Sequence, residues 1–469
     1  MTTVSSNIIT ENKLKNEEYK IWKKVVPSLY QHIITFKPIF SDIPTEQIEN
    51  LCKCINFTDK IINDSNGNGT LTTSAFCSLG DKIYEFDFTL PLGAYDTTNS
   101  DGPLPDPKYN DHEISYIAEE TKYNSKWIWS GETIIKLVPL SEKKFLALSK
   151  SGSVAIFQDG SESPLKAVMD TSTERNDDII VDMDVSKDLK SIIKTKSNLI
   201  THQTIVEIID NATTWGNKVV SISLNDILIN QILFLNNEND DTSGKENCGF
   251  IALGNENQVY IWNNISQQNQ EPNFTLKVEN NILHISISPF IPTLFALGFV
   301  NGSLRFYDIR NIKAQDPSHV KENYLFELNQ LNEDPVVNII FSEVSPFELL
   351  SIGKSGNVYH WNLEYVFNQV NREGFDNLEG EFINQRAVQS ECLTFYHTGG
   401  ARRSFGLGSC KNSVSYHPLI DDFVVTVDND GSLSVYKPCI GRYLLEEESE
   451  DGEDNSNNND NNLNSDNVN

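Results

Sequence analysis

The side chains that most often carry catalysis or bind metals are scattered through this sequence. The seven cysteines never form a CxxC pair, so their spacing matches neither a zinc site nor a redox dithiol. The eight histidines are also dispersed, and there is no P-loop, dinucleotide-binding glycine motif, HExxH helix or nucleophile elbow. The cysteines are Cys52, Cys54, Cys77, Cys248, Cys392, Cys410 and Cys439. We therefore predict no enzyme activity, no metal, no cofactor, and free thiols in a reducing compartment.

The charge of the chain is compatible with a basic partner. Asp and Glu number 66 against 37 Lys and Arg, which gives a net charge of −29. Such a field repels nucleic acid and anionic membranes, and the chain has no apolar run of 18 residues and no signal-peptide core. We expect no membrane association and no direct sequence-specific binding of nucleic acid. A basic protein partner and simple solubility both explain the acidity.

A pattern of turn, alternating strand and terminal aromatic residue repeats along the chain. The clear copies are KSGSVAIFQD (150–159), ENQVYIWNN (256–264), VNGSLRFYDIR (300–310), KSGNVYHWNLE (354–364) and NDGSLSVYKP (429–438). They end on Phe157, Trp262, Tyr307, Trp361 and Tyr436, and weaker copies end near Phe86 and His202. The successive ends lie 45 to 75 residues apart. A unit of about 40 to 45 residues with this ending is the signature of a WD40 blade, and the longer intervals indicate blades with loop insertions.

A second apolar strand precedes each clear copy, as in KFLALSK, GFIALGN, TLFALGF, ELLSIGK and FVVTVDN. We therefore predict an all-β fold, a seven-bladed WD40 propeller; a β-sandwich or two unrelated β domains are the alternatives. The expected parts are a disordered N-terminus (1–16), an amphipathic helix (17–36), the propeller (37–443) and a disordered acidic tail (444–469). The expected loop insertions are 59–74, 94–113, 236–247 and 371–400.

The segment EEYKIWKKVVPSLYQHIITF (17–36) carries apolar residues at i, i+3 and i+4, which predicts a helix with one apolar stripe. Pro27 predicts a kink. A propeller needs no helix for closure, so we expect this helix to dock on the outside of the ring. It is either a plain clamp on the blade edge or, through Leu29, Ile33 and Phe36, one wall of a binding groove.

Several segments together resemble the retinoblastoma-binding, MSI-type WD-repeat histone-binding proteins. They are EEYKIWKK followed by PSLY, then GETIIKLVPLSEKKFLAL, SPFIPTLFALGFVNGSLRFYDIRNIK, LTFYHTGG, and SVSYHPLIDDFVVTVDNDGSLSVYKP. The family includes the small subunit of chromatin assembly factor 1, and the Tyr-Lys-Pro ending and acidic tail are most similar to its fungal forms.

The resemblance implies a groove for the first helix of histone H4, between the N-terminal helix and a loop inserted before the last blade. Carboxylates of the loop would pair with histone arginines, because a carboxylate accepts two parallel hydrogen bonds from a guanidinium group. The implied histone-binding residues are Leu29, Ile33, Ile34 and Phe36 from the helix, and Asp376, Glu379, Glu381, Glu391, Leu393 and Phe395 from the loop.

The family also binds histone H3 tails or arginine-rich peptides in the central channel, through a ring of carboxylates. Only Glu132 matches that ring here, while Asn230, Asn281 and Pro335 stand at other acidic positions. The resemblance therefore supports the H4 groove more than the channel site.

These features together predict a histone chaperone subunit of the nucleus, with the cytoplasm as a second location. It would hold histones H3–H4 for nucleosome assembly on newly replicated DNA, together with larger subunits of a chromatin assembly complex. The acidic tail would screen basic histones or simply keep the protein soluble. The alternatives are a scaffold subunit of a histone acetyltransferase or deacetylase complex, and a propeller that has lost direct histone binding. An RNA-assembly role would require a basic face.

Overall fold

The computed structural model describes residues 30–438 except 41–42, 64–69, 92–113, 116–119, 122, 142–143, 171–174, 212–214, 236–248, 264–270, 314–323, 374–384 and 399–412. Nearly all of the described residues belong to one compact unit, His32–Lys437. A second unit, Met1–Gln31 with Pro438–Asn469, contributes only Tyr30, Gln31 and Pro438 to the description. The predictions for 1–16, for the insertions 94–113 and 236–247, and for the tail 444–469 thus fall on residues outside the described part.

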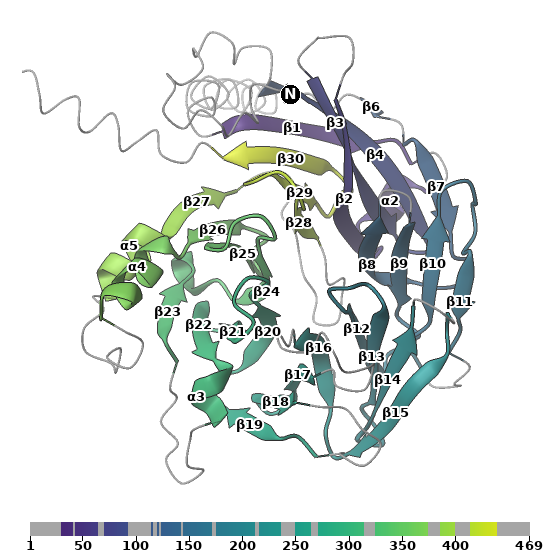
Figure 1. Cartoon of the computed structure of the whole chain (residues 1–469). Helices are drawn as coiled ribbons and strands as arrows, with labels where there is room; N and C mark the ends of the chain where they lie inside the picture. The colour runs from purple at the N-terminus through teal and green to yellow at the C-terminus, as the bar shows by residue number, and fades with distance from the viewer. Residues whose placement is uncertain are drawn as a thin grey trace, which may run out of the picture. The chain divides into compact units, whose positions relative to one another are not determined.

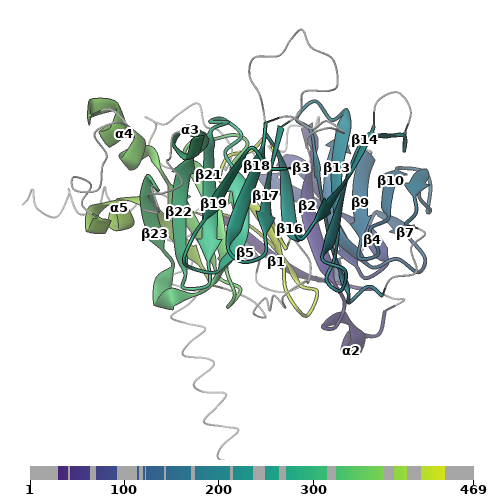
Figure 2. The same cartoon turned by 90° about the horizontal axis from the view of Figure 1, so that it is seen from below.

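The described strands form seven sheets of at least four strands, here numbered as blades 1 to 7 (Figures 1 and 2). Blade 1 contains β2 (Lys53–Asn63), β3 (Thr70–Leu79), β4 (Lys82–Pro91) and β7 (Ser125–Ile128), and blade 2 contains β8 (Ile134–Ser141), β9 (Lys144–Ser149), β10 (Val154–Gln158) and β11 (Lys166–Val168). Blade 3 contains β12 (Ile179–Val185), β13 (Ser191–Asn198), β14 (Gln203–Asp210) and β15 (Lys218–Asn225), and blade 4 contains β16 (Ile229–Leu235), β17 (Gly249–Gly254), β18 (Gln258–Trp262) and β19 (Phe274–Lys277). Blade 5 contains β20 (Ile282–Ile287), β21 (Leu294–Phe299), β22 (Ser303–Asp308) and β23 (Phe326–Asn329), and blade 6 contains β24 (Val336–Phe341), β25 (Glu348–Gly353), β26 (Val358–Asn362) and β27 (Leu393–His397). Blade 7 contains β28 (Val414–Tyr416), β29 (Val424–Val427), β30 (Leu433–Pro438) and β1 (Tyr30–Pro38), with β5 (Ile114–Ser115) and β6 (Glu120–Thr121) on the outer edge of β1.

The helices between the described strands are short. They are α2 (Thr45–Ile48), α3 (Ile309–Lys313), the 3-10 turn η3 (Leu331–Glu333), α4 (Glu364–Glu373) and α5 (Gln385–Cys392). None of them has the length and apolar composition needed to cross a bilayer.

Buried side chains join each blade to the next. In the first junction Phe76 of blade 1 packs on Phe145 of blade 2, with ring centroids 4.3 Å apart. Further apolar clusters join blades 2 and 3, 3 and 4, 4 and 5, and 5 and 6. Phe57 of blade 1 stacks on Phe423 of blade 7, and a hydrogen bond connects His360 of blade 6 to Tyr436 of blade 7. The sheets therefore close into a ring, and the prediction of a seven-bladed all-β propeller is confirmed.

The aromatic residues that define the repeat lie in the third strand of their blades. Phe157, Trp262, Tyr307, Trp361 and Tyr436 are all buried. Trp262 stacks on Phe250 of the second strand at 4.3 Å, and Trp361 Nε1 donates to Ser351 Oγ at 2.8 Å. The prediction of a strand end near His202 is wrong, because His202 lies in the turn before β14.

The chain is a strand where the sequence pattern predicts the end of a helix. Residues 30–36 form most of β1, so the helix prediction is wrong there, while 17–29 lie outside the described residues. The β-branched and aromatic run Ile33–Phe36 suits a strand, and the edge of β30 offers a backbone ladder to pair with. β1 therefore completes blade 7 with a strand from the opposite end of the chain.

Polar side chains on the innermost strands form a second set of links between blades. Gln231 Nε2 donates to Ile285 O at 2.8 Å, and Ile285 N donates to Gln231 Oε1 at 3.1 Å. Asp182 Oδ2 accepts from Ile232 N at 3.0 Å. The same arrangement recurs as Asn56 to Leu137 O, Lys136 to Met183 O, Ile339 N to His284, and Phe57 N to Ser415. In each link, the side chain of one blade bonds to the backbone of the next blade, at the residue that follows the equivalent position there. These side chains therefore fix how neighbouring blades align.

We expect Gln231→Leu to lower the free energy of unfolding by about 2–4 kcal/mol, because it leaves a buried N–H and a buried C=O of Ile285 without partners. Gln203→Leu, at an exposed site on β14, is the control and should change stability by less than about 0.5 kcal/mol. Urea denaturation of both variants measures the difference. Equal stability of the two would mean that the innermost links do not hold the blades together.

Two predicted insertions contain regular structure. In 59–74, β2 continues to Asn63 and β3 begins at Thr70, with Ile61 opposite Thr73, while 64–69 are not among the described residues. The segment 371–400 includes the end of α4, all of α5 and β27, the outer strand of blade 6. The prediction of plain loops is wrong for these parts.

Most described cysteines match the prediction of free thiols. Cys54, Cys77 and Cys392 are free and buried. Cys52 is disulfide-bonded, so the prediction is wrong for this thiol.

Candidate functional site

The residues predicted on the helical wall of the groove lie on β1, apart from Leu29, which is outside the described residues. Phe36 is 5% exposed and packs on Phe88, with ring centroids 5.2 Å apart. Ile33 is 7% exposed, and Ile34 is partly buried against the apolar cluster between blades 7 and 1. Ile33 and Phe36 are therefore core residues and do not form an exposed wall.

The loop side of the predicted groove is a helical insertion in blade 6. Val388 and Cys392 of α5 pack with Val366 of α4 in the cluster between blades 5 and 6. Gln389 fastens α5 to the outer strand of blade 5, since its side chain accepts from Asn329 N and donates to Asn329 O, both at 2.8 Å. The insertion is thus held from two sides.

Among the predicted arginine-binding carboxylates, the structure describes Glu391 and places it, exposed, in the last turn of α5. Asp376, Glu379 and Glu381 lie outside the described residues. The attachment of α5 gives Glu391 a fixed position beside the start of β27.

The predicted apolar contacts of the loop lie on β27. Leu393 and Phe395 are half-buried, and the ring of Phe395 lies 6.5 Å from that of Tyr436 on β30. His397 stacks on the same tyrosine at 4.1 Å, and His360 Nε2 lies 2.9 Å from its hydroxyl oxygen. β27 therefore faces β30, the strand that pairs with β1.

The loop half of the predicted groove thus lies at one junction, here called the 6–7 seam, formed by β26 and β27 of blade 6 and β30 of blade 7. The other half, on β1, packs on the opposite side of blade 7, against blade 1. Sequence reasoning missed His360, His397 and Tyr436, which build this seam. The terminal Tyr436 was visible as a strand end, but nothing in the sequence pattern indicates its two histidine partners.

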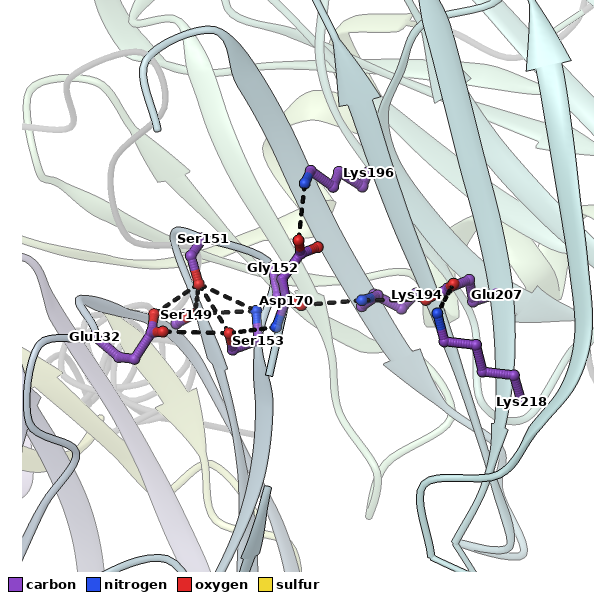
Figure 3. Close-up of polar contacts among 10 residues, drawn as sticks. All are labelled: Glu132, Ser149, Ser151, Gly152, Ser153, Asp170, Lys194, Lys196, Glu207 and Lys218. Carbon is purple, nitrogen blue, oxygen red and sulfur yellow. Dashed lines mark hydrogen bonds and ion pairs between the residues drawn. The ribbon is translucent and has the colours of Figure 1, made fainter. Parts of the chain in front are cut away.

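Glu132, the predicted channel residue, lies just before β8 and is held by serine hydroxyls (Figure 3). Ser151 Oγ donates to its Oε2 at 2.6 Å, and Ser153 Oγ donates to Oε1 at 3.2 Å. Both serines belong to the turn between β9 and β10, in which Gly152 has φ +92°. The carboxylate of Glu132 therefore stabilises this turn.

Lysines pair with the other two acids of this region (Figure 3). Lys194 Nζ donates to Gly152 O at 3.0 Å and pairs with Glu207 at 3.2 Å, and Lys218 pairs with the same carboxylate. Burial raises the pKa of Glu207, but the hydrogen bond from Lys218 and the charge of Lys194 outweigh it and bring the pKa below its ordinary value. Lys196 pairs with Asp170 at 3.1 Å. The charges of these residues balance, so the described part of this region contains no acidic ring.

The other predicted ring positions are also engaged within the fold. Asn281 Oδ1 accepts from Asn257 Nδ2, and Pro335 O accepts from Lys354 N. The neighbouring acid, Asp334, is 8% exposed and accepts from Ser355 N. The third position, Asn230, is an amide on β16. These contacts give no support to a peptide site in the channel.

One group of described carboxylates is close enough to share a ligand. Oxygens of Glu348, Asp421 and Asp422 all lie within 4.8 Å of one another, next to the 6–7 seam. No second observation points to a cation at this place, so the prediction that the protein needs no metal or cofactor stays a prediction.

Comparisons with known proteins give a consistent answer. No protein-family profile matches the chain. It is 34% identical to the transcriptional regulatory protein UME1 of Saccharomyces cerevisiae, over 93% of this chain and 97% of the relative. It is 31% identical to the transcriptional modulator WTM2 over 89% of this chain and 94% of the relative, and 28% identical to WTM1 over 89% and 98%, both from the same yeast. By this similarity over nearly the whole length, and by its propeller fold, the chain belongs to the family of the yeast transcriptional regulator UME1 and the transcriptional modulators WTM1 and WTM2.

Proposed function

We propose that this protein is a nuclear, non-enzymatic propeller that regulates transcription by binding a basic protein partner, histones H3–H4, at the 6–7 seam. The transcriptional roles in the names of its relatives support the coarse assignment. The net charge of −29 supports a basic partner. The observation that carries the position of the site is the contact of β27 with Tyr436, because it brings the blade 6 insertion next to the blade that β1 completes.

The proposed binding mode combines charge with apolar contact. Glu391 is exposed on a helix that is already held in place. Its carboxylate can therefore accept hydrogen bonds from an arginine of the first helix of histone H4 without the cost of ordering the helix first. The half-buried Leu393 and Phe395 would contact the apolar face of the same helix.

We expect Glu391→Lys to weaken binding of a peptide covering the first helix of histone H4 by roughly tenfold, the effect of losing one charge-assisted pair. Fluorescence titration at several salt concentrations measures it, and wild-type affinity should fall as salt rises. The matched control is Glu162→Lys, an exposed acid of blade 2, which makes the same change in net charge. Equal weakening by both variants, or no binding by wild type, would refute the proposed position.

The complex to which the protein belongs is a separate part of the proposal. Histone binding would serve either deposition of H3–H4 on newly replicated DNA or a histone acetyltransferase or deacetylase assembly. Isolation of the tagged protein from nuclear extract distinguishes these by the enzymes or chaperone subunits that accompany it.

A second candidate is a regulatory scaffold that does not bind histones itself. The engagement of Glu132 by Ser151 and Ser153, with Lys194 nearby, favours this candidate, because the described residues around Glu132 then form no ring of free carboxylates. In that case partner proteins would still associate with Glu391→Lys as they do with wild type.

A further inference from the structure

Three carboxyl groups meet where blade 7 closes on blade 6. Glu348 begins β25 of blade 6, whereas Asp421 and Asp422 lie in the turn between β28 and β29 of blade 7. One oxygen from each lies within 4.8 Å of the others. Glu348 Oε2 and Asp421 Oδ1 are buried and accept no hydrogen bond. Three ionised carboxylates at this separation would repel one another strongly.

The groups that face this carboxyl cluster supply little positive charge. Lys437 of β30 acts on Asp422, and the neutral Tyr416 of β28 faces all three carboxyl groups, with Tyr436 of β30 next to it. Burial, and then the charges of Asp422 and Asp421, raise the pKa of Glu348 to about 9. Burial, and then the charge of Asp421, raise the pKa of Asp422 to about 6. At neutral pH the cluster therefore retains a proton.

We propose that a proton shared by Glu348, Asp421 and Asp422 fastens blade 7 to blade 6, so that this junction weakens as the pH rises. A protonated carboxyl group donates a short, strong hydrogen bond to a neighbouring carboxylate. Loss of the proton replaces that bond with like-charge repulsion across the two blades. This inference does not depend on histone binding.

The sign of the pH dependence follows from the raised pKa of Glu348. Its contribution to stability is fully present below the ordinary carboxyl pKa of about 4.5, because the folded and unfolded states then both bind the proton. The contribution is lost progressively as the pH rises through the value in the folded protein. Between the pKa of Glu348 in the unfolded chain and its pKa in the folded protein, this group should lower the folding equilibrium constant by up to about tenfold per pH unit.

The test is urea denaturation of wild type and Glu348→Gln at pH 6, 7, 8 and 9, in EDTA so that no divalent cation competes with the proton. Glutamine keeps the size and a hydrogen-bond donor but does not ionise. We expect the ratio of the folding constants, variant over wild type, to rise by up to about tenfold per pH unit. Asp422→Asn should reproduce part of the rise, and Glu162→Gln on blade 2 should give a constant ratio.

Hydrogen exchange locates the effect. Between pH 7 and 9, after correction for the intrinsic pH dependence of exchange, the amides of β29 and β30 should lose protection in wild type but not in Glu348→Gln. Amides of β13 and β14 in blade 3 should keep theirs.

Three results would overturn the proposal. The first is a ratio of folding constants that does not change with pH, and the second is loss of protection spread evenly over all blades. The third is recovery of stability at pH 9 when calcium is added, in wild type but not in Glu348→Gln. That result would mean that the cluster binds a cation. If neither variant folds, wild-type stability that does not fall above pH 6 would also refute it.

Discussion

Phe36→Ala should destabilise this protein by about 3–5 kcal/mol, the usual cost of truncating a fully buried phenylalanine. Phe36 is 5% exposed and packs against Phe86 and Phe88 of blade 1 from its position on β1. The cavity would thus open where the N-terminal strand completes the ring. Denaturation by urea or guanidinium measures the loss.

Ile39→Ala is the matched control, because Ile39 follows β1 directly and is 39% exposed. It should cost less than about 1 kcal/mol. If instead Phe36→Ala kept full stability and lost only binding of the histone peptide, Phe36 would be a groove residue, and its assignment to the core would be wrong.

Between pH 7 and pH 5, the free energy of unfolding of His360→Gln should fall by about 2 kcal/mol less than that of wild type. Burial lowers the pKa of His360 to about 3, and His360 Nε2 lies 2.9 Å from the hydroxyl oxygen of Tyr436. Its ordinary pKa is near 6.5, so at pH 5 the unfolded chain binds a proton that the folded protein excludes. The stability from the neutral histidine is thus present above about pH 6.5 and is lost as the pH falls towards 3.

His417 gives an independent second case on the other side of blade 7. Its Nε2 lies 2.8 Å from Thr73 Oγ1 of blade 1, and burial also lowers its pKa to about 3. His417→Asn retains an acceptor for the N–H groups of Leu419 and Ile420, and should remove a similar share of the acid sensitivity. The double variant should remove about twice as much acid sensitivity as either single variant, because the two histidines lie on opposite sides of the blade and act independently.

Denaturation midpoints at pH 7, 6 and 5 provide the measurement, with His202→Asn as the control at an exposed turn. The carboxyl cluster at Glu348 acts with the opposite sign over this range, so each variant is compared with wild type at the same pH. An acid sensitivity equal to wild type in both histidine variants would mean that these rings bind a proton in the folded state.

Blade 7 differs from the other blades in what holds it. Blades 1 to 6 join one another through apolar clusters, alongside the polar links of their innermost strands. Blade 7 shares an apolar cluster with blade 1, but hydrogen bonds of His360 and His417 and the carboxyl cluster also lie at its two sides. It also combines strands from both ends of the chain, so it is the blade whose attachment the solution conditions should affect most.

The candidate site could be predicted only in part. The sequence placed Leu393 and Phe395 in the segment that reaches blade 7, and the structure brings both to β27 beside the 6–7 seam. It could not indicate that α5 is anchored to Asn329, because a glutamine bound to a backbone amide leaves no periodic signal. Glu132 also reads as a free acid in the sequence, whereas its hydroxyl partners are found only once the turn between β9 and β10 is formed.

The sequence by itself determined the all-β class, the repeat and the burial of its terminal aromatics such as Trp262 and Trp361, because strand alternation and turns are local properties. Only the tertiary structure decided that residues 30–36 form a strand, since the same apolar residues fit a helical stripe until the free edge of β30 offers backbone partners. It also decided the links between innermost strands, because Gln231, Asp182 and His284 differ in type and become equivalent only when the blades align. Local patterns thus specified the blades, whereas long-range hydrogen bonding and burial specified how the ring closes.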